Sequence, residues 1–415
     1  MPVLLIATLD TKGVECHFVR SLLDAANVPV TVLDAGVLQP PAFTPDIARA
    51  EVYAAAGASL AALQKNADRG KAIEAAAKGA AKIAQDLHDQ CRLDGVFGLG
   101  GSAGTTIATA AMRALPFGVP KLMVSTLASG QVRPYVGVRD VMMLHSVVDI
   151  CGLNRISRRV LTNAANAMIG MVREKGVKKG VRNLFGEKVP DTFLADKPLV
   201  TASMFGVTTP CVEAARTVVE QAGYEVLVFH ATGSGGQTME SFIADGLISG
   251  VLDLTTTELA DELVGGILTA GPDRLTAAGL RGVPQVISLG ALDMVNFGPP
   301  ETVTEKFKDR RFYQHNPTVT LMRTTPEEND KLGKEIAHKA SAAKGPTAVL
   351  VPLRGVSAID AEGKPFWWPE ADKALVDSLR LWMSPHVKLV ELDMHINDPQ
   401  FAEVAAQTLL EHVRA

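Results

Sequence analysis

The sequence has few cysteines, few aromatic residues and little net charge, and each shortage removes a class of protein. Four cysteines are spread over 415 residues without a CxxC pair or a metal-ligand spacing, which predicts reduced thiols in a cytoplasmic protein. Aromatic residues make up 5% of the chain, too few for a platform that stacks single-stranded nucleic acid. A formal net charge of −4, with dispersed Lys and Arg, provides no basic stripe for a nucleic-acid partner.

Long apolar runs are also missing. The longest uncharged window, 95–112, contains five glycines, a poor composition for a membrane span. The apolar start "VLLIAT" is only strand-length, has no basic residues before it, and leads directly to Asp10 and Lys12. We therefore expect neither a secretory signal nor a membrane span.

What the sequence does contain is a regular alternation of short apolar runs and helical stretches. This alternation, in a chain of 415 residues with 47% hydrophobic content, predicts an α/β protein of two Rossmann-like domains in tandem, each with a doubly wound, mostly parallel sheet. The domains are predicted at 1–180 and 198–415, with a linker at 175–198 rich in basic residues and glycine. Strands are predicted at 3–8, 28–34, 95–100, 121–126, 140–146, 198–205, 224–230, 250–254, 284–289, 318–323, 347–353 and 387–393. Helices are predicted at 13–26, 69–90, 105–115, 153–174, 209–222, 236–246, 257–268, 326–342, 371–383 and 399–413.

The stretch "DGVFGLGGSAGT", 94–105, raises the possibility of a phosphate site. A glycine-rich turn that leads into a helix offers free N–H groups and the positive end of a helix dipole. Hydroxyls of Ser102 and Thr105 add donors. The lysine of a Walker A loop is absent here, but Lys12, after the first strand, can supply a cation, and Asp10 beside it can hold Mg²⁺.

The same stretch also fits the pattern G-x-G-x-x-A, from Gly98 to Ala103, which keeps a dinucleotide site open. Two observations weigh against that alternative: the pattern follows the third predicted strand, and no acidic residue ends the next strand, "KLMVST". Close packing of helix on strand would also explain the glycines. We favour phosphate binding because Ser, Thr and Lys gather at neighbouring strand ends.

Polar side chains also follow the strands of the second half. The turn "HATGSGGQTME", 230–240, can hold a carboxylate or a phosphate, and Glu258 is interpreted as an acid of a helix first turn. Each of these side chains is explained singly by a cap or a loop hydrogen bond, and only their concentration at strand ends points to an active cleft. The candidates for catalysis or anion binding are Asp293, His315, Arg354 and Asp360.

These motifs together resemble a known family. The segments "TLDTKG", "GLGGSAGT", "STLASGQ", "TTTELADELVGG" and "HINDP" are similar to those of the ATP-binding domain of the tobamovirus-resistance (Tm-one-like) family, and the resemblance extends over nearly the whole chain. It implies ATP in the first of two Rossmann-like domains, self-association as a dimer, and a member that lacks the C-terminal barrel of the plant protein. The implied ATP contacts are Asp10, Thr11, Lys12, Ala35, Arg69, Gly100, Gly101, Ser102, Gly104, Thr105, Ser125 and Thr126.

Three hypotheses follow. The first is an ATP-dependent enzyme, with ATP and Mg²⁺ on the first domain and a small carboxylated or phosphorylated metabolite in a cleft against the second. In that hypothesis Arg354 anchors the anion, and Asp293, His315 or Asp360 handles protons or binds metal. The second is a non-catalytic binding module that responds to nucleotide. The third is an NAD(P) oxidoreductase.

Overall fold

The computed structural model describes residues 1–66, 68–173 and 197–414. The chain divides into two compact units, Met1–Leu194 and Ala195–Ala415. The predicted linker, 175–198, falls outside the described residues up to position 196. Each unit is an α/β fold around a parallel sheet, as the alternation of apolar runs and helices predicts.

The N-terminal unit contains one five-stranded sheet in which every neighbouring pair is parallel. Its strands are β1 (Val3–Ala7), β2 (Val30–Asp34), β3 (Gly95–Gly100), β4 (Lys121–Ser125) and β5 (Met142–His145). The strand order is β2-β1-β3-β4-β5. The direction of winding therefore reverses between β1 and β3, and in open α/β sheets ligands bind outside the carboxyl ends of the strands at such a reversal.

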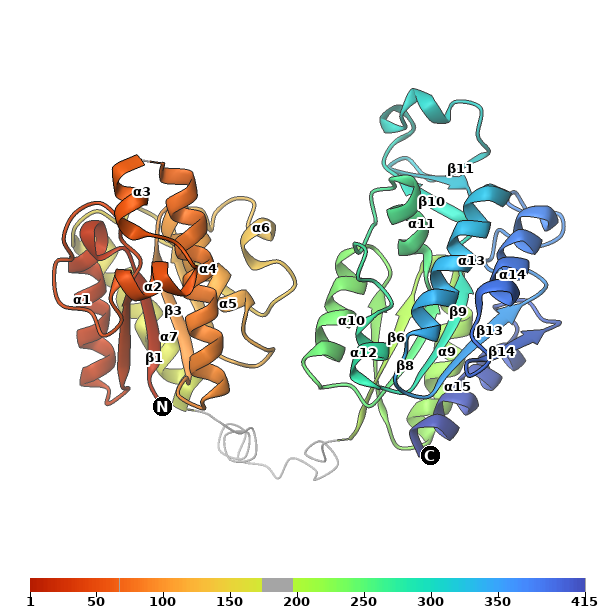
Figure 1. Ribbon diagram of the computed structural model, residues 1–415, viewed down its shortest axis with the longest axis horizontal. Helices are drawn as coiled ribbons and strands as arrows, with labels where there is room; N and C mark the ends of the chain where they lie inside the picture. The colour runs from red at the N-terminus through yellow and green to blue at the C-terminus, as the bar shows by residue number, and fades with distance from the viewer. Residues whose placement is uncertain (67, 174–196, 415) are drawn as a thin grey trace. The chain divides into compact units, whose positions relative to one another are not determined.

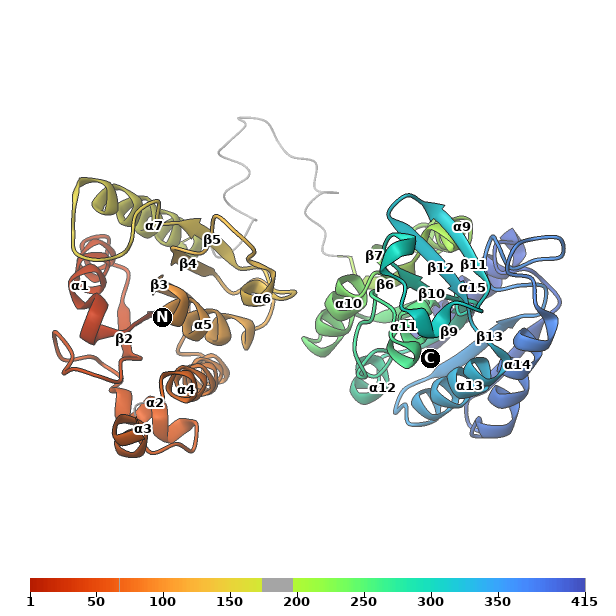
Figure 2. The ribbon, with the colours of Figure 1, turned by 90° about the horizontal axis from the view of Figure 1, so that it is seen from above.

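Helices cover both faces of this sheet, which explains why its central strands are apolar throughout. The helices are α1 (Leu9–Ala25), α2 (Arg49–Ala55), α3 (Leu60–Asn66), α4 (Arg69–Asp89), α5 (Ser102–Arg113), α6 (Arg133–Val136) and α7 (Arg155–Arg173). Figure 2 shows α1 and α7 on one face and α2 to α5 on the other. Alternate residues of β1 enter the two cores: Leu5 packs with α1 and α7, and Ile6 packs with α4 and α5.

The C-terminal unit has a larger parallel sheet and a small antiparallel one. Its strands are β6 (Leu199–Met204), β7 (Glu225–His230), β8 (Gly250–Thr255), β9 (Gln285–Gly290), β10 (Met294–Phe297), β11 (Phe312–Asn316), β12 (Val319–Arg323), β13 (Thr347–Pro352) and β14 (Lys388–Leu392). The large sheet has the order β14-β13-β9-β8-β6-β7, and the small sheet has the order β10-β12-β11. In this unit the winding reverses between β6 and β8.

The small antiparallel sheet was not predicted. The strand predicted at 318–323 exists as β12, but it pairs antiparallel with β10 and β11 and does not belong to the parallel sheet. Figure 1 shows β10 and β11 at one end of the unit. Local hydrophobic pattern identifies a strand but not its partner, because partner choice depends on contacts distant in sequence. Neither β10 nor β11 was predicted, and β11 is short and mostly exposed.

Helices also cover both faces of the large sheet. They are η2 (Gly206–Thr208), α9 (Thr209–Gln221), α10 (Ser234–Ala244), α11 (Thr257–Val264), α12 (Ala277–Arg281), η3 (Pro300–Thr302), η4 (Glu305–Phe307), α13 (Pro326–Ser341), α14 (Pro369–Trp382) and α15 (Pro399–Arg414). One core joins α9 and α15 to the sheet, and another joins α11, α13 and α14 to it. Within the described ranges, no helix is both long enough and apolar enough to span a membrane.

Candidate functional site

The glycine-rich loop after β3 lies at the reversal point of the N-terminal sheet. Helix α5 begins at Ser102, three residues before the predicted start, so the loop residues 102–104 form its first turn. Gly101 is the N-cap, and no side chain caps the helix. A Cβ at Gly100 would lie 2.9 Å from the Cα of Gly104, so only glycine permits this turn. The first-turn amides therefore offer the donors and the dipole of an anion site.

A cavity of about 440 Å³ opens beside this turn. It joins the carboxyl end of β1 to the segment 35–38 and to the starts of α4 and α5, and most of its wall is apolar. Four of the predicted ATP contacts that precede the glycine-rich loop in sequence line this cavity, namely Asp10, Thr11, Ala35 and Arg69. The other lining residues are Thr8, Asp10, Gly36, Val37, Leu38, Tyr53, Leu63, Asp68, Ala72, Ile73, Ala103 and Ile107.

Asp10 has a structural role in this wall. Its Oδ2 accepts hydrogen bonds from the backbone N–H groups of Val37 at 3.1 Å and Leu38 at 2.9 Å, and Arg49 Nη1 lies 3.9 Å away. The carboxylate thus anchors the 35–38 segment. The described residues contain no group of three or more His, Cys, Asp or Glu side chains that could hold a metal ion. The Mg²⁺ that accompanies ATP uses only one or two protein carboxylates besides phosphate and water, so a role for Asp10 as its ligand stays a prediction.

A buried ion pair supports the same segment, and the sequence analysis missed it. Asp34, at the end of β2, accepts hydrogen bonds from the backbone N–H groups of Leu9 at 3.0 Å and Gly36 at 2.8 Å. Its other oxygen accepts from Arg49 Nε at 2.6 Å. The sequence did contain an indication of a polar role for Asp34, because an acidic residue ends the second predicted strand. Its partner Arg49 lies 15 residues further along the chain, and no local pattern connects the two.

The buried side chains of Thr105 and Ser125 lie on the core side of the glycine-rich loop and bond to it. Their hydroxyl oxygens are 2.7 Å apart, and both side chains are fully buried. The Thr105 hydroxyl also donates to the carbonyl of Gly101 at 2.8 Å, and the Ser125 hydroxyl accepts from the N–H of Leu127 at 2.9 Å. These hydroxyls are therefore engaged within the protein, which corrects the expectation that they face a ligand. Thr126 is half-buried beside the loop.

Lys12 interrupts α1 with non-helical backbone angles, φ −126° and ψ 21°. Its side chain is half-buried and does not line the cavity, and its ammonium makes no hydrogen bond or ion pair with any residue that the structure describes. A role for Lys12 at the loop stays a prediction. The residues Gly101, Ser102 and Gly104 remain partly or fully exposed at the first turn of α5.

The second glycine-rich loop does hold a carboxylate, and it is one of the chain's own. Glu258 Oε1 accepts the backbone N–H groups of Gly233 at 2.7 Å and Gly236 at 3.1 Å, at the start of α10. Its Oε2 accepts from Arg274 Nε at 2.7 Å. A Cβ at Gly236 would lie 2.1 Å from that carboxylate. Burial nevertheless raises the pKa of Glu258, against the opposing effect of Arg274 and of the Gly233 amide.

Two of the predicted catalytic residues meet in a buried cluster. Asp293 Oδ2 accepts from the Ser357 hydroxyl at 2.8 Å, and Asp360 Oδ1 lies 3.6 Å from Arg323 Nη2. Arg323 Nη2 also donates to Asp372 Oδ1 at 2.5 Å. Burial raises the pKa of Asp293 well above its usual value, and burial together with the charge of Asp360 raises that of Asp372 to about 7. Asp372 was missed because an acid in a helix first turn is ordinary.

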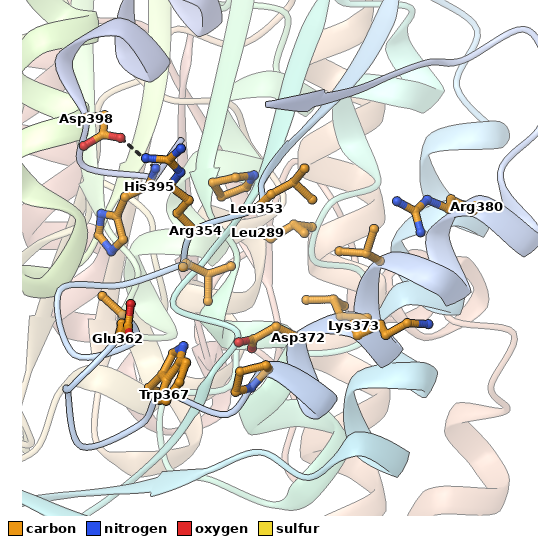
Figure 3. A pocket seen from close by; sticks show the side chains of 17 residues that line it. Leu289, Leu353, Arg354, Glu362, Trp367, Asp372, Lys373, Arg380, His395 and Asp398 are labelled. Atoms are coloured by element: carbon orange, nitrogen blue, oxygen red, sulfur yellow. Dashed lines mark hydrogen bonds between the residues drawn. The ribbon is translucent and has the colours of Figure 1, made fainter. Parts of the chain in front are cut away.

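The other two predicted catalytic residues are not in this cluster. His315 is exposed on β11, at the edge of the small sheet, and not in a loop before a strand. Arg354 forms a bidentate pair with Asp393, with Nε–Oδ1 at 2.8 Å and Nη2–Oδ2 at 2.7 Å. Its guanidinium is therefore already paired and is not a free anchor for an anion. Arg354 lines a second cavity, of about 880 Å³, at the carboxyl ends of β9 and β13 (Figure 3).

The two units match the two domains of one protein family. Residues 1–176 match the N-terminal domain, and residues 197–413 the C-terminal domain, of the uncharacterised protein family UPF0261. A UPF0261 protein of Clostridium tetani is 50% identical over 409 residues, with 98% of each chain covered. The ToMV resistance protein Tm-1(GCR237) of Solanum lycopersicum is 43% identical over 348 residues, which are 83% of this chain and 45% of the tomato protein.

Among solved structures, a UDP-N-acetylglucosamine 2-epimerase from Rickettsia bellii is similar to the chain, with a TM-score of 0.23 and 9% identity over 99% of this chain and 95% of that one. A likeness at this level carries no inference about function.

Proposed function

We propose that this chain, which belongs to the UPF0261 family, binds ATP in its N-terminal unit, at the reversal point between β1 and β3. The observation that carries the proposal is the uncapped first turn of α5 after a loop that only glycine permits at position 100. Such a turn presents several N–H donors and a positive dipole end to one anion. The resemblance stated above implies the same ligand and the same loop.

The adjacent cavity suits the rest of a nucleotide. Its volume of about 440 Å³ is within the range of small-molecule sites, and such sites combine an apolar wall with a few polar groups. Val37, Leu38, Ile73 and Ile107 provide apolar surface for a base. Arg69, exposed in the first turn of α4, supplies a cation at the same cavity.

The dinucleotide alternative has less support. A Rossmann site for NAD uses an acidic side chain at a strand end to bind the ribose hydroxyls. Asp34 occupies such a position, but both of its oxygens are already engaged with Leu9, Gly36 and Arg49. The ribose of a bound NAD would have to replace Arg49 as the partner of Asp34 and break this buried ion pair.

Two carboxylates line this cavity, Asp10 and Asp68. Asp10 Oδ2 accepts from the 35–38 segment, and Asp68 Oδ1 accepts from Lys71 N–H at 3.0 Å. An ionised carboxylate has about four acceptor sites, so these hydrogen bonds leave each side chain able to accept another. We therefore propose ATP binding as the function of this site, which is common to the ATP-dependent enzyme and to the non-catalytic module.

Isothermal titration calorimetry tests the proposal. We expect heat with ATP and with ADP, in the presence of magnesium, and none with NADH. The variant Gly101→Val should abolish the ATP heat without unfolding, because a Cβ there meets nothing nearer than Thr126 Oγ1 at 3.7 Å and the side chain would cover the amides. Gly170→Val, also at an open glycine of the same unit, is the matched control. Absence of heat with ATP in the wild-type protein would refute the proposal.

A further inference from the structure

The cavity of the C-terminal unit has an excess of negative charge, although it is lined by cations as well as acids. It has a volume of about 880 Å³ and lies outside the carboxyl ends of β9 and β13, beside the first turns of α14. Parallel α/β sheets bind ligands at this edge. Figure 3 shows Glu362 and Trp367 toward the left of the view, Asp372 near its middle and Arg380 toward the right.

Each cation of this cavity is already neutralised by a carboxylate that does not line it. Arg354 is held by Asp393 in a bidentate pair. Arg380 is held by Glu391, with Nε–Oε1 at 2.7 Å and Nη2–Oε2 at 2.6 Å. The third cation, Lys373, pairs with Asp377 one turn along α14.

Two of the three acids of the lining have no such partner among the described residues. Glu362 is exposed and makes no ion pair or hydrogen bond with any residue in the described ranges. Asp398 accepts the backbone N–H of His395 at 2.8 Å and has no cation within ion-pair distance among those residues. His395 adds no charge, because its Nδ1 accepts from Asn397 N–H at 3.1 Å while its Nε2 donates to the Ser357 carbonyl at 2.9 Å.

Asp372 is the lining member of a group of three acids that share one cation. The Arg323 guanidinium pairs with Asp372 at 2.5 Å and lies 3.6 Å from Asp360, and Asp293 is buried next to them. Burial raises the pKa of all three acids, so protons neutralise the charge that Arg323 leaves unpaired. A cation bound beside Asp372 would replace such a proton and pair with the carboxylate.

We propose that this cavity binds a small metabolite through a primary ammonium group, placed between Glu362, Asp372 and the ring of Trp367. The Trp367 side chain is 44% exposed at the cavity, and an indole face attracts a cation. The carboxylates supply charge-assisted hydrogen bonds to the ammonium. Leu289, Val356 and other apolar residues of the lining accommodate the rest of the ligand.

Saturation-transfer NMR with three probes of equal size tests the charge preference. The probes are benzylammonium, benzyl alcohol and benzoate. We expect saturation transfer to benzylammonium, less to the alcohol and none to benzoate. Transfer to benzoate equal to or stronger than that to benzylammonium would overturn the proposal, and so would the absence of transfer to all three.

Two variants with exposed side chains locate the binding. Glu362→Gln and Trp367→Leu should each weaken benzylammonium binding about two- to fivefold, and neither disturbs a buried contact of its side chain. Glu213→Gln, which removes an exposed acid from α9, is the matched control and should leave the affinity unchanged. If neither cavity variant weakens binding, or if the control weakens it as much, the proposed site is wrong.

Discussion

The two glycine-rich loops of this chain start from the same local chemistry and differ in what fills them. Each follows a parallel strand and leads into a helix with no side-chain cap, α5 in one unit and α10 in the other. At α10 the amides of Gly233 and Gly236 bind the Glu258 carboxylate. At α5 no side chain of the described residues takes that place. The filled loop, residues 230–236, shows that the first amides of such a helix hold a carboxylate. The unfilled loop, residues 100–104, is the one at which we propose a ligand.

The two loops also differ in the role of the buried polar groups around them. In the filled loop the anion is part of the buried core, fixed by Arg274 from the opposite side. In the unfilled loop the buried polar groups, Thr105 and Ser125, bond to each other beneath the turn. An enclosed internal anion thus stabilises one unit, whereas the other unit keeps its donors toward solvent.

The largest expected effect comes from emptying the filled loop. Glu258→Ala leaves the Gly233 and Gly236 amides without an acceptor and removes a partner of Arg274, so we expect the C-terminal unit to lose about 3 kcal/mol of unfolding free energy. Urea unfolding followed by tryptophan fluorescence measures this, because all three tryptophans, Trp367, Trp368 and Trp382, lie in this unit.

Formate then tests whether the vacated loop still binds an anion. We expect formate, but not chloride, to restore part of the stability lost in Glu258→Ala, since formate supplies the missing carboxylate. The exposed Glu213→Ala serves as the control and should lose less than about 0.5 kcal/mol. Equal responses of the two variants to formate would mean that the loop has no special affinity for a carboxylate.

The next largest effect comes from filling the unfilled loop. Ala103 is the second residue of α5 and lines the cavity. Ala103→Glu places an acid where the helix dipole favours it, so the fold should be retained. The same carboxylate repels phosphate, and like-charge contacts cost several kcal/mol, so ATP affinity should fall about 100-fold or more. The neutral variant Ala103→Gln separates charge from bulk in the same calorimetric titration; an equal loss in both variants would argue against an anion at this turn.

A third difference between the units is their dependence on pH. Burial raises the pKa of Asp261 and, with Asp360, that of Asp372 to about 7. A raised pKa means that these acids stabilise the fold most below about pH 4, and that the contribution is lost as the pH rises through 7. The raised pKa values of the N-terminal unit, about 12 for Cys16 and Tyr53, lie above this window.

We therefore expect the unfolding free energy of the C-terminal unit to fall between pH 5 and pH 7 by up to about 1.4 kcal/mol per pH unit for each such group. Urea titrations read by tryptophan fluorescence at several pH values measure the slope. Asp261→Asn should flatten it. A C-terminal unit whose stability is constant over this range would contradict the assignment of these protonated acids.

The elements of both units were largely predictable because their signals are local. The strand predicted at 95–100 is Gly95–Gly100, and the helix predicted at 69–90 is Arg69–Asp89. The position of the glycine-rich loop before α5 followed from the same local pattern of strand, glycines and helix. The pairing of strands depends on contacts distant in sequence, so the antiparallel pairing of β12 with β10 and β11 was not predicted.

The roles of single polar residues in the site were less predictable, because each depends on a partner far along the chain. Glu258 has the sequence position of an acid in a helix first turn, and only the fold brings the Gly233 amide, 25 residues earlier, to its carboxylate. The contact between Thr105 and Ser125 spans 20 residues and requires β3 and β4 to be neighbours. Sequence identifies polar residues near strand ends; the fold decides which of them face inward.

The smallest expected effect distinguishes a supporting hydroxyl from a ligand contact. Thr105→Val removes the buried hydroxyl at nearly constant shape, and Ser125 still accepts from Leu127 N–H, so the N-terminal unit should lose about 1 kcal/mol. ATP affinity should change by less than about threefold, since the hydroxyl is engaged below the turn. Ser102→Ala, at the exposed first residue of α5, should show the opposite pattern, with weaker ATP binding and unchanged stability. Calorimetric unfolding and ATP titration of both variants test this prediction. A large loss of ATP affinity in Thr105→Val would make Thr105 a phosphate contact and place the ligand deeper in the loop than we propose.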